Sequence, residues 1–129
     1  MTANEIQKYN KYTIPQLLKK ATKVFNAFIR KRDEDQGCIS CGSYGNLQAG
    51  HYYSAGHYPI LAFNENNCNF QCVRCNMYLS GNLLEYRKNL IKKIGIAEVE
   101  KLDQIVARVK RTGYKHDRFK LIEIILKYL

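Results

Sequence analysis

The stretch QCVRCN, residues 71–76, decides how the centre of this chain folds. Its two cysteines have C-x-x-C spacing, and a second such pair lies upstream in CISC, residues 38–41. Each pair can form a tight turn whose two thiolates point at one ion, and four thiolates satisfy the tetrahedral preference of zinc. The spacing therefore predicts a structural Zn²⁺ site whose binding free energy supports folding. Its predicted ligands are Cys38, Cys41, Cys72 and Cys75.

The alternative for this pattern is a set of free buried thiols. The N-terminus is polar and lacks the apolar stretch of a signal peptide, and no apolar run is long enough to cross a membrane, so we expect a cytoplasmic protein. Disulfides are rare in that compartment, which favours a metal. The fifth cysteine, Cys68, lies four residues before Cys72 and is expected to be a small buried side chain rather than a ligand.

Length and charge limit the class of protein. The chain has 129 residues and a formal net charge of +10. This length fits one domain with a modest core, and the apolar content is too high for a disordered chain. A strongly basic balance favours an anionic partner, of which nucleic acid is the commonest. The alternative is a basic protein whose helix faces are simply solvated.

Apolar spacing predicts the elements around the cysteines. Apolar residues recur at helical spacing over residues 13–32, where Thr13 and Gln16 form a capping-box pattern. Residues 51–53 and 60–63 are predicted to be the two strands of a β-hairpin. Helices are expected after the second cysteine pair, with a break at SGN, residues 80–82, a helix end at Gly95 and another near Gly113. The predicted fold is a single domain, α+β and mainly α. Its parts are an N-terminal helix over 13–32, a core over 38–80 and C-terminal helices over 81–129.

Three polar residues lie around the cysteine pairs: His51 in QAGHYYS, Asn67 in FNENN, and Asn76 directly after the last cysteine. Their order resembles the HNH nuclease superfamily, in which a β-hairpin and a helix hold one catalytic divalent ion beside a general-base histidine. The last residue of that motif is usually a histidine. An asparagine there resembles the endonuclease VII type of Holliday junction resolvase, which also carries a zinc held by four cysteines. The resemblance implies an HNH-type ββα-metal or treble-clef zinc core.

A longer set of motifs narrows the resemblance. CISCG, QAGHY, FNENN, QCVRCN, SGN, EYR and LIKKIG occur in this order, preceded by FNAFIRKRD. Together they resemble the phage NinG family, also called Rap, the recombination endonucleases of the lambda type. The resemblance covers roughly residues 25–95. It implies a phage- or prophage-encoded enzyme, acting in the bacterial host cell, that cuts branched DNA such as Holliday junctions or D-loops during recombination.

The residue types support this chemistry independently. Phosphodiester hydrolysis needs a base to activate water and a metal ion to stabilise charge on the phosphate. His51 can be the base because imidazole titrates near neutral pH. The carboxamide oxygen of Asn76 is a hard ligand suited to Mg²⁺ or Mn²⁺, and Asn67 is expected to orient the hairpin or the histidine. The alternatives are that His51 is a structural histidine, that Asn76 is an ordinary polar residue of a helix, and that Asn67 only forms a turn.

One position departs from the HNH pattern. Many HNH enzymes have a metal-binding aspartate directly before the base, and here that residue is Gly50. A second ligand to the catalytic ion must then be water or another side chain. The candidates are His57, Glu65 and Glu85.

Several residues are candidates for contacting DNA. Tyrosines at positions 52, 53 and 58 could stack on exposed bases or simply pack within the hairpin. A two-fold junction is most simply cut by a dimer, so a homodimer is one expectation. The alternative function is a non-catalytic zinc module that binds nucleic acid. Basic side chains near the proposed site could hold phosphates, with plain solvation as the alternative: Arg74, Arg87 and Lys88.

Overall fold

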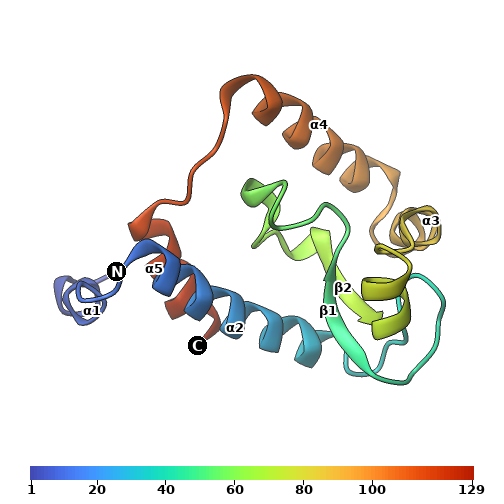
Figure 1. Cartoon of the computed structure of the whole chain (residues 1–129), viewed down its shortest axis with the longest axis horizontal. Coiled ribbons are helices and arrows are strands. Elements are labelled where there is room, and N and C mark those ends of the chain that lie inside the picture. Colours follow the sequence, from blue (N-terminus) through green and yellow to red (C-terminus); the bar gives the residue numbers. More distant parts are fainter.

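A two-stranded antiparallel sheet surrounded by helices forms the centre of the computed structural model of this chain (Figure 1). The structure describes residues 1–109 and 113–129 in full and only the backbone of residues 110–112. Strand β1 (Leu47–His51) pairs with β2 (Cys68–Cys72), so that Leu47 lies opposite Cys72 and His51 opposite Cys68. The expected mainly helical α+β architecture is confirmed.

The prediction of a strand at residues 60–63 is wrong, and of the predicted strand 51–53 only His51 belongs to β1. Pro59–Leu61 forms a 3₁₀ turn, and a second one, Glu65–Asn67, leads directly into β2. The true second strand carries Asn69 and Gln71, whose side chains are buried and hydrogen-bonded. These buried polar residues hide the alternation of apolar and polar side chains by which a strand is usually found in a sequence.

The N-terminal and C-terminal helices form one helical unit. Helix α2 (Ile14–Arg32) starts at the predicted capping box on Thr13, and α5 (Arg118–Tyr128) starts at Asp117. The two helices lie side by side although the rest of the chain separates them in sequence (Figure 1). A short helix that the sequence analysis did not predict, α1 (Ala3–Lys8), precedes them. Their apolar core contains Tyr9, Leu17, Ala21, Leu121, Ile122 and Ile125.

Two further helices pack against the long connection between the strands. Helix α3 (Leu83–Ile94) ends at Gly95, and α4 (Ile96–Thr112) ends at Gly113, as the sequence predicts. Gly95 has a positive φ of 88°, which allows the sharp change of direction between the helices. Only one turn of helix, the π-helical Arg74–Tyr78 that contains Cys75, lies between β2 and the expected break. The buried side chains of this part are Leu61, Tyr86, Leu90, Val99, Leu102 and Val106.

An ionic cluster around the buried Asp33 joins α2 to β2 and α3. The Asp33 carboxylate follows the last turn of α2 and accepts hydrogen bonds from Arg32 at 2.8 and 2.9 Å and from Lys93 at 3.1 Å. It also accepts the backbone N–H of Phe70. Burial raises the pKa of Asp33, but the hydrogen bonds and positive charges of Arg32 and Lys93 outweigh burial and leave the pKa below its usual value.

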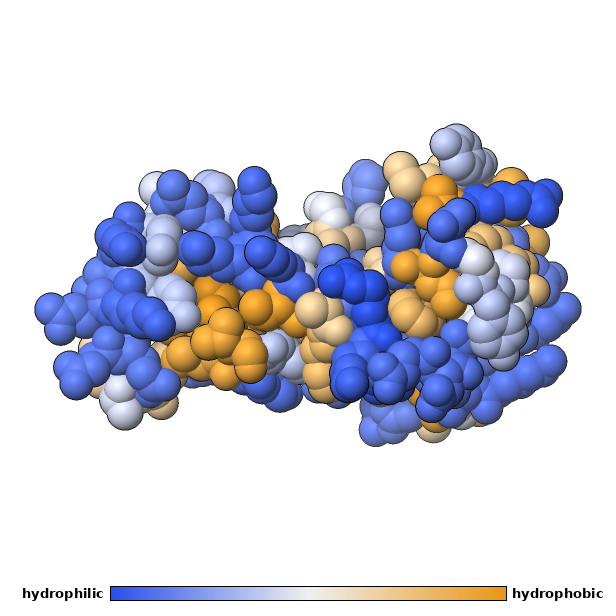
Figure 2. Space-filling view, turned by 90° about the horizontal axis from the view of Figure 1, so that it is seen from below, coloured by the Kyte–Doolittle hydropathy of each residue, from blue (hydrophilic) through white to orange (hydrophobic). Residues whose placement is uncertain are grey.

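The surface is mostly hydrophilic. Figure 2 shows one face on which blue predominates and orange forms patches of limited size in both halves of the molecule. Within the part of the chain that the structure describes, no helix is long and apolar enough to cross a membrane.

Candidate metal centre and adjoining cavity

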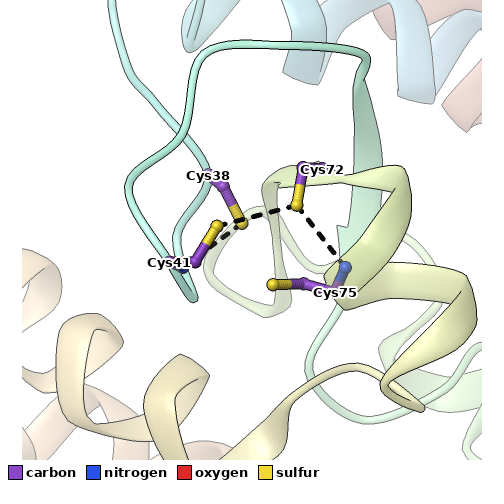
Figure 3. A group of neighbouring side chains, drawn as sticks. All are labelled: Cys38, Cys41, Cys72 and Cys75. Carbon is purple, nitrogen blue, oxygen red and sulfur yellow. Dashed lines mark hydrogen bonds between the residues drawn. The ribbon is translucent and has the colours of Figure 1, made fainter.

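The four paired cysteines come together as predicted. One pair lies in the loop before β1, and the other spans the end of β2 and the turn that follows it (Figure 3). All four sulfur atoms lie within 4.8 Å of one another, and the Sγ atoms of Cys41 and Cys72 are 3.7 Å apart. Tetrahedral zinc with Zn–S bonds of about 2.3 Å places its sulfurs about 3.8 Å apart. The cluster therefore has the size and ligand set of a closed zinc site.

Backbone amides already orient these sulfurs. Cys38 Sγ accepts N–H groups from Ser40 and Cys41 at 3.4 Å, and Cys72 Sγ accepts the N–H of Cys75 at 3.4 Å. The hydrogen bond with Ser43 lowers the pKa of Cys41 to about 6, so this thiol ionises readily. Such contacts to metal ligands fix their direction and favour the thiolate form.

Cys68 is separate from this cluster, as expected. It is buried against Phe25 and Ile29 of α2 and does not belong to the four-sulfur group. Burial raises its pKa to about 12, so it remains a neutral thiol.

A cavity of about 380 Å³ adjoins the second cysteine pair, and both His51 and Asn76 contribute to its lining. Asn76 donates from Nδ2 to Oε1 of Gln48 on β1 at 2.9 Å, which fixes the plane of its carboxamide. Among the described residues nothing donates a hydrogen bond to Asn76 Oδ1, so this oxygen is available to a ligand. Gln48 is a positioning residue that the sequence analysis missed, because a glutamine on a strand gives no distinctive signal.

The His51 ring lies on the other side of β1. Since side chains alternate along a strand, Gln48 and His51 point to opposite faces, and the His51 ring contacts Phe25 of α2. Its Nε2 donates to the Ala62 carbonyl at 2.8 Å, and its Nδ1 lies 3.9 Å from Cys68 Sγ. Burial lowers the pKa of His51, which keeps the ring neutral. To accept a proton from water, Nδ1 must exchange the Cys68 thiol for that water.

Asn67 closes the long loop between the strands. Its Oδ1 accepts the N–H of Tyr53 at 2.9 Å, while its Nδ2 donates to the carbonyls of Tyr53 at 2.9 Å and Leu61 at 3.1 Å. The side chain is fully buried. These contacts fix the loop, and a role of Asn67 in orienting the hairpin or the histidine stays a prediction.

Each residue proposed as a further ligand to the catalytic ion has another partner in the structure. His57 is exposed and contacts Ser54, and Glu85 pairs with Lys88 at 3.6 Å. Glu65 is bound by Tyr128 at 2.6 Å on the α5 side. Apart from the four cysteines, no group of three or more His, Cys, Asp or Glu side chains in the described residues is close enough to share an ion.

Gly50 is required by its surroundings. A Cβ atom at this position would lie 2.2 Å from Oε1 of Gln71, so an aspartate there would displace that side chain. Gln71 in turn binds Ser40 and the Gly81 carbonyl, which links β2 to the first cysteine pair and to the turn before α3. The space that an aspartate at position 50 would need is thus taken by Gln71.

The basic and aromatic candidates divide into two groups. Arg74 and Lys88 are exposed. Arg87 instead forms an ion pair with Asp103 at 2.9 Å and contacts Tyr52, so its guanidinium is committed within the fold. Tyrosines 52, 53 and 58 pack ring against ring at 4.9 and 5.1 Å, and all three line the cavity. Packing is therefore established for these rings, whereas stacking on bases stays a prediction.

Comparisons with known proteins place the chain in a family. The family model described as bacteriophage lambda NinG protein matches residues 3–128. The match extends well beyond residues 25–95, where the sequence motifs lie. No solved structure matches the chain.

Curated relatives agree with this match. The chain is 49% identical to the NinG protein of Salmonella phage P22 over 108 residues, which is 82% of this chain and 52% of that protein. It is 48% identical to the NinG protein of Escherichia phage lambda over 88 residues, or 67% of this chain and 43% of that protein. The chain thus spans about half the length of these relatives. On these grounds the chain belongs to the bacteriophage NinG protein family.

Proposed function

We propose that this NinG-family chain is a metal-dependent, structure-selective DNA endonuclease that acts on branched recombination intermediates in the phage-infected host cell. The observation that carries the proposal is the cavity beside the second cysteine pair. There Asn76 is held by Gln48 with its carboxamide oxygen uncommitted, and His51 contributes to the same lining. The net charge of +10 supports DNA as the partner.

The proposed chemistry assigns one task to each residue. Asn76 Oδ1 would hold a Mg²⁺ or Mn²⁺ ion, which supplies charge stabilisation to the phosphate and the leaving oxygen. His51, kept neutral by burial, would remove a proton from the attacking water through Nδ1 once that water takes the place of the Cys68 thiol. The Ala62 carbonyl accepts the hydrogen bond from His51, and Asn67 binds the carbonyl of the preceding residue, Leu61. Asn67 thereby holds the loop against which His51 is oriented. With Gly50 in place, the remaining ligands to the ion are water and DNA phosphate.

A nicking assay on branched DNA, with and without Mg²⁺, tests this proposal. His51→Ala should lower the cleavage rate by roughly 10²–10⁴-fold while zinc content and DNA affinity stay unchanged, because a general base contributes about that factor. Asn76→Ala should have a comparable effect, and Asn76→Asp should retain activity, since a carboxylate is also a hard oxygen ligand. Cleavage by His51→Ala at the parent rate would refute the assignment.

A second function is supported by the contacts of His51. Both ring nitrogens are engaged, and the described residues provide no further carboxylate or imidazole cluster for an ion. These features fit a zinc module that binds nucleic acid without cutting it. The two functions differ in one result: the binding module shows salt-sensitive affinity for branched DNA but no Mg²⁺-dependent cleavage.

A further inference from the structure

The segment after the second cysteine pair exposes an unusual amount of apolar surface. Within eight residues, Met77 is 63% exposed, Tyr78 78% and Leu84 87%, and Leu79 and Leu83 are exposed as well. We call these five residues the apolar tip. Single exposed apolar side chains are ordinary, but a run of them marks a contact surface. This surface has no assigned role in hydrolysis.

The apolar tip is held rigidly. Ser80, Gly81 and Asn82 have φ angles of 50°, 91° and 44°, a left-handed conformation that residues with side chains rarely adopt. The Gly81 N–H donates to the Cys75 carbonyl at 2.8 Å, and Asn82 Nδ2 contacts Cys75 Sγ at 3.5 Å. The cysteine cluster therefore fixes the backbone of the turn. Strained backbone of this kind is concentrated at functional positions.

Its neighbours identify the kind of partner. Exposed Arg74 precedes the apolar tip, exposed Lys88 follows it with Glu85 as its ion-pair partner, and Leu83 lines the same cavity as Asn76. Two copies of a chain with a net charge of +10 would repel each other if they met through this surface. A polyanion is attracted to it. Intact duplex DNA keeps its apolar base faces stacked inside, whereas a branch point exposes them.

We propose that the apolar tip packs against unstacked bases at a DNA branch point, with Tyr78 and Leu84 as the principal contacts. This inference rests on the proposed function insofar as it takes branched DNA as the partner. It goes further by assigning the recognition of the branch to a particular surface. The cavity next to the apolar tip would then receive the phosphate beside the opened base pair.

The test measures binding of the zinc-loaded chain without Mg²⁺, so that DNA stays uncut. A four-way junction carrying 2-aminopurine at the branch is compared with a linear duplex of the same sequence. The double variant Tyr78→Ser/Leu84→Ser should lose about tenfold in preference for the junction, as expected when a stacking contact is removed. The variant's affinity for the linear duplex should equal that of the parent. The rise in 2-aminopurine fluorescence that the parent causes on binding the junction should be absent with the variant. The matched control is Ile96→Ser/Phe119→Ser, which removes apolar side chains of 49% and 50% exposure on other helices and should bind like the parent.

The outcomes separate this inference from the nuclease assignment. An unchanged junction preference in the Tyr78→Ser/Leu84→Ser variant would overturn the inference, even if the parent cuts DNA. A parent that sediments as a dimer and a variant that sediments as a monomer would also overturn it, because the surface would then join two copies. A parent that shows the fluorescence rise but never cuts with Mg²⁺ or Mn²⁺ would uphold the inference and refute only the nuclease.

Discussion

The helical unit and the cysteine region are stabilised in opposite ways. In the helical unit, α2 and α5 bury a continuous set of aliphatic and aromatic side chains against each other. Around the cysteines, the only partly buried apolar residue packed against the sulfurs, among those described, is Leu47. In a region with so little apolar burial, a metal held by the four cysteines would supply stability beside the buried polar contacts. The comparison teaches that one chain can contain two regions that respond to different perturbations.

Loss of the metal should produce the largest difference between the two regions. We expect Cys72→Ser to remove the metal, because a closed zinc site needs all four ligands, and binding in small zinc modules is worth on the order of 10–16 kcal/mol. Hydrogen exchange should then show lost protection over residues 38–82 and retained protection in α2 and α5. Elemental analysis should find one zinc per chain in the parent and in the control Cys68→Ser, and none in Cys72→Ser. Loss of protection over both regions together would contradict the comparison.

A cavity in the helical unit should have the reverse effect. Leu121→Ala removes a buried side chain between α5 and α2 and should lower the free energy of unfolding by about 3–4 kcal/mol. Zinc content should stay at the parent level. Denaturant unfolding followed by circular dichroism measures the loss, and Leu129→Ala, at an exposed position of the same segment, should stay near the parent.

The ionic cluster around Asp33 connects the two regions and should have a smaller effect. Asp33→Ala leaves Arg32 and Lys93 without their carboxylate, and we expect a loss of about 2–3 kcal/mol, below the usual range for buried pairs because both cations are partly exposed. The folded-state pKa of Asp33 is lowered, so its contribution is present above its unfolded pKa of about 3.9 and is lost as the pH falls through the folded value. The parent should therefore destabilise more steeply in acid than the variant. Asp35→Ala, at an exposed position, should behave like the parent.

The cap of α2 should contribute least. Thr13 and Gln16 satisfy each other's backbone N–H groups at 2.8 and 3.3 Å, and Thr13→Ala should cost about 1 kcal/mol. The loss should appear in the helical unit alone, as faster hydrogen exchange in the first turn of α2. Unchanged exchange in that turn would mean that packing against α5 already fixes the helix start.

The parts that local pattern determines were predictable from the sequence. The paired cysteines, the α2 cap and the glycines that end α3 and α4 each depend on residues close in sequence, and the structure contains all of them. Strand β2 was missed because its polar side chains are satisfied by partners far away in the chain, such as Ser40 for Gln71. The reason for Gly50 was equally hidden, since it lies in the space that Gln71 occupies.

The candidate site was predicted less completely than the metal cluster. Asn67 is hydrogen-bonded to Tyr53 and Leu61, and Asn76 directly follows the second cysteine pair with its nitrogen bound to Gln48, while the roles of both residues in hydrolysis stay predictions. Its partner Gln48 could not be foreseen, because the pairing depends on the strand register. The contacts of His51 with Ala62 and Cys68 could not be foreseen either, because the sequence analysis assigned residues 60–63, and not 68–72, to the second strand.

The packing of α5 on α2 also governs the order in which the chain can fold during synthesis. The apolar face of α2 leaves the ribosome well before its partner helix, because the cysteine region, α3 and α4 lie between α2 and α5 in the sequence. Meanwhile both cysteine pairs emerge close together, so the metal-binding region can close first on local contacts. Until α5 arrives, the exposed face of α2 is a site where newly made chains can associate with one another or with a chaperone. We therefore expect truncation before α5 to yield insoluble protein even when the cysteine region still binds its metal.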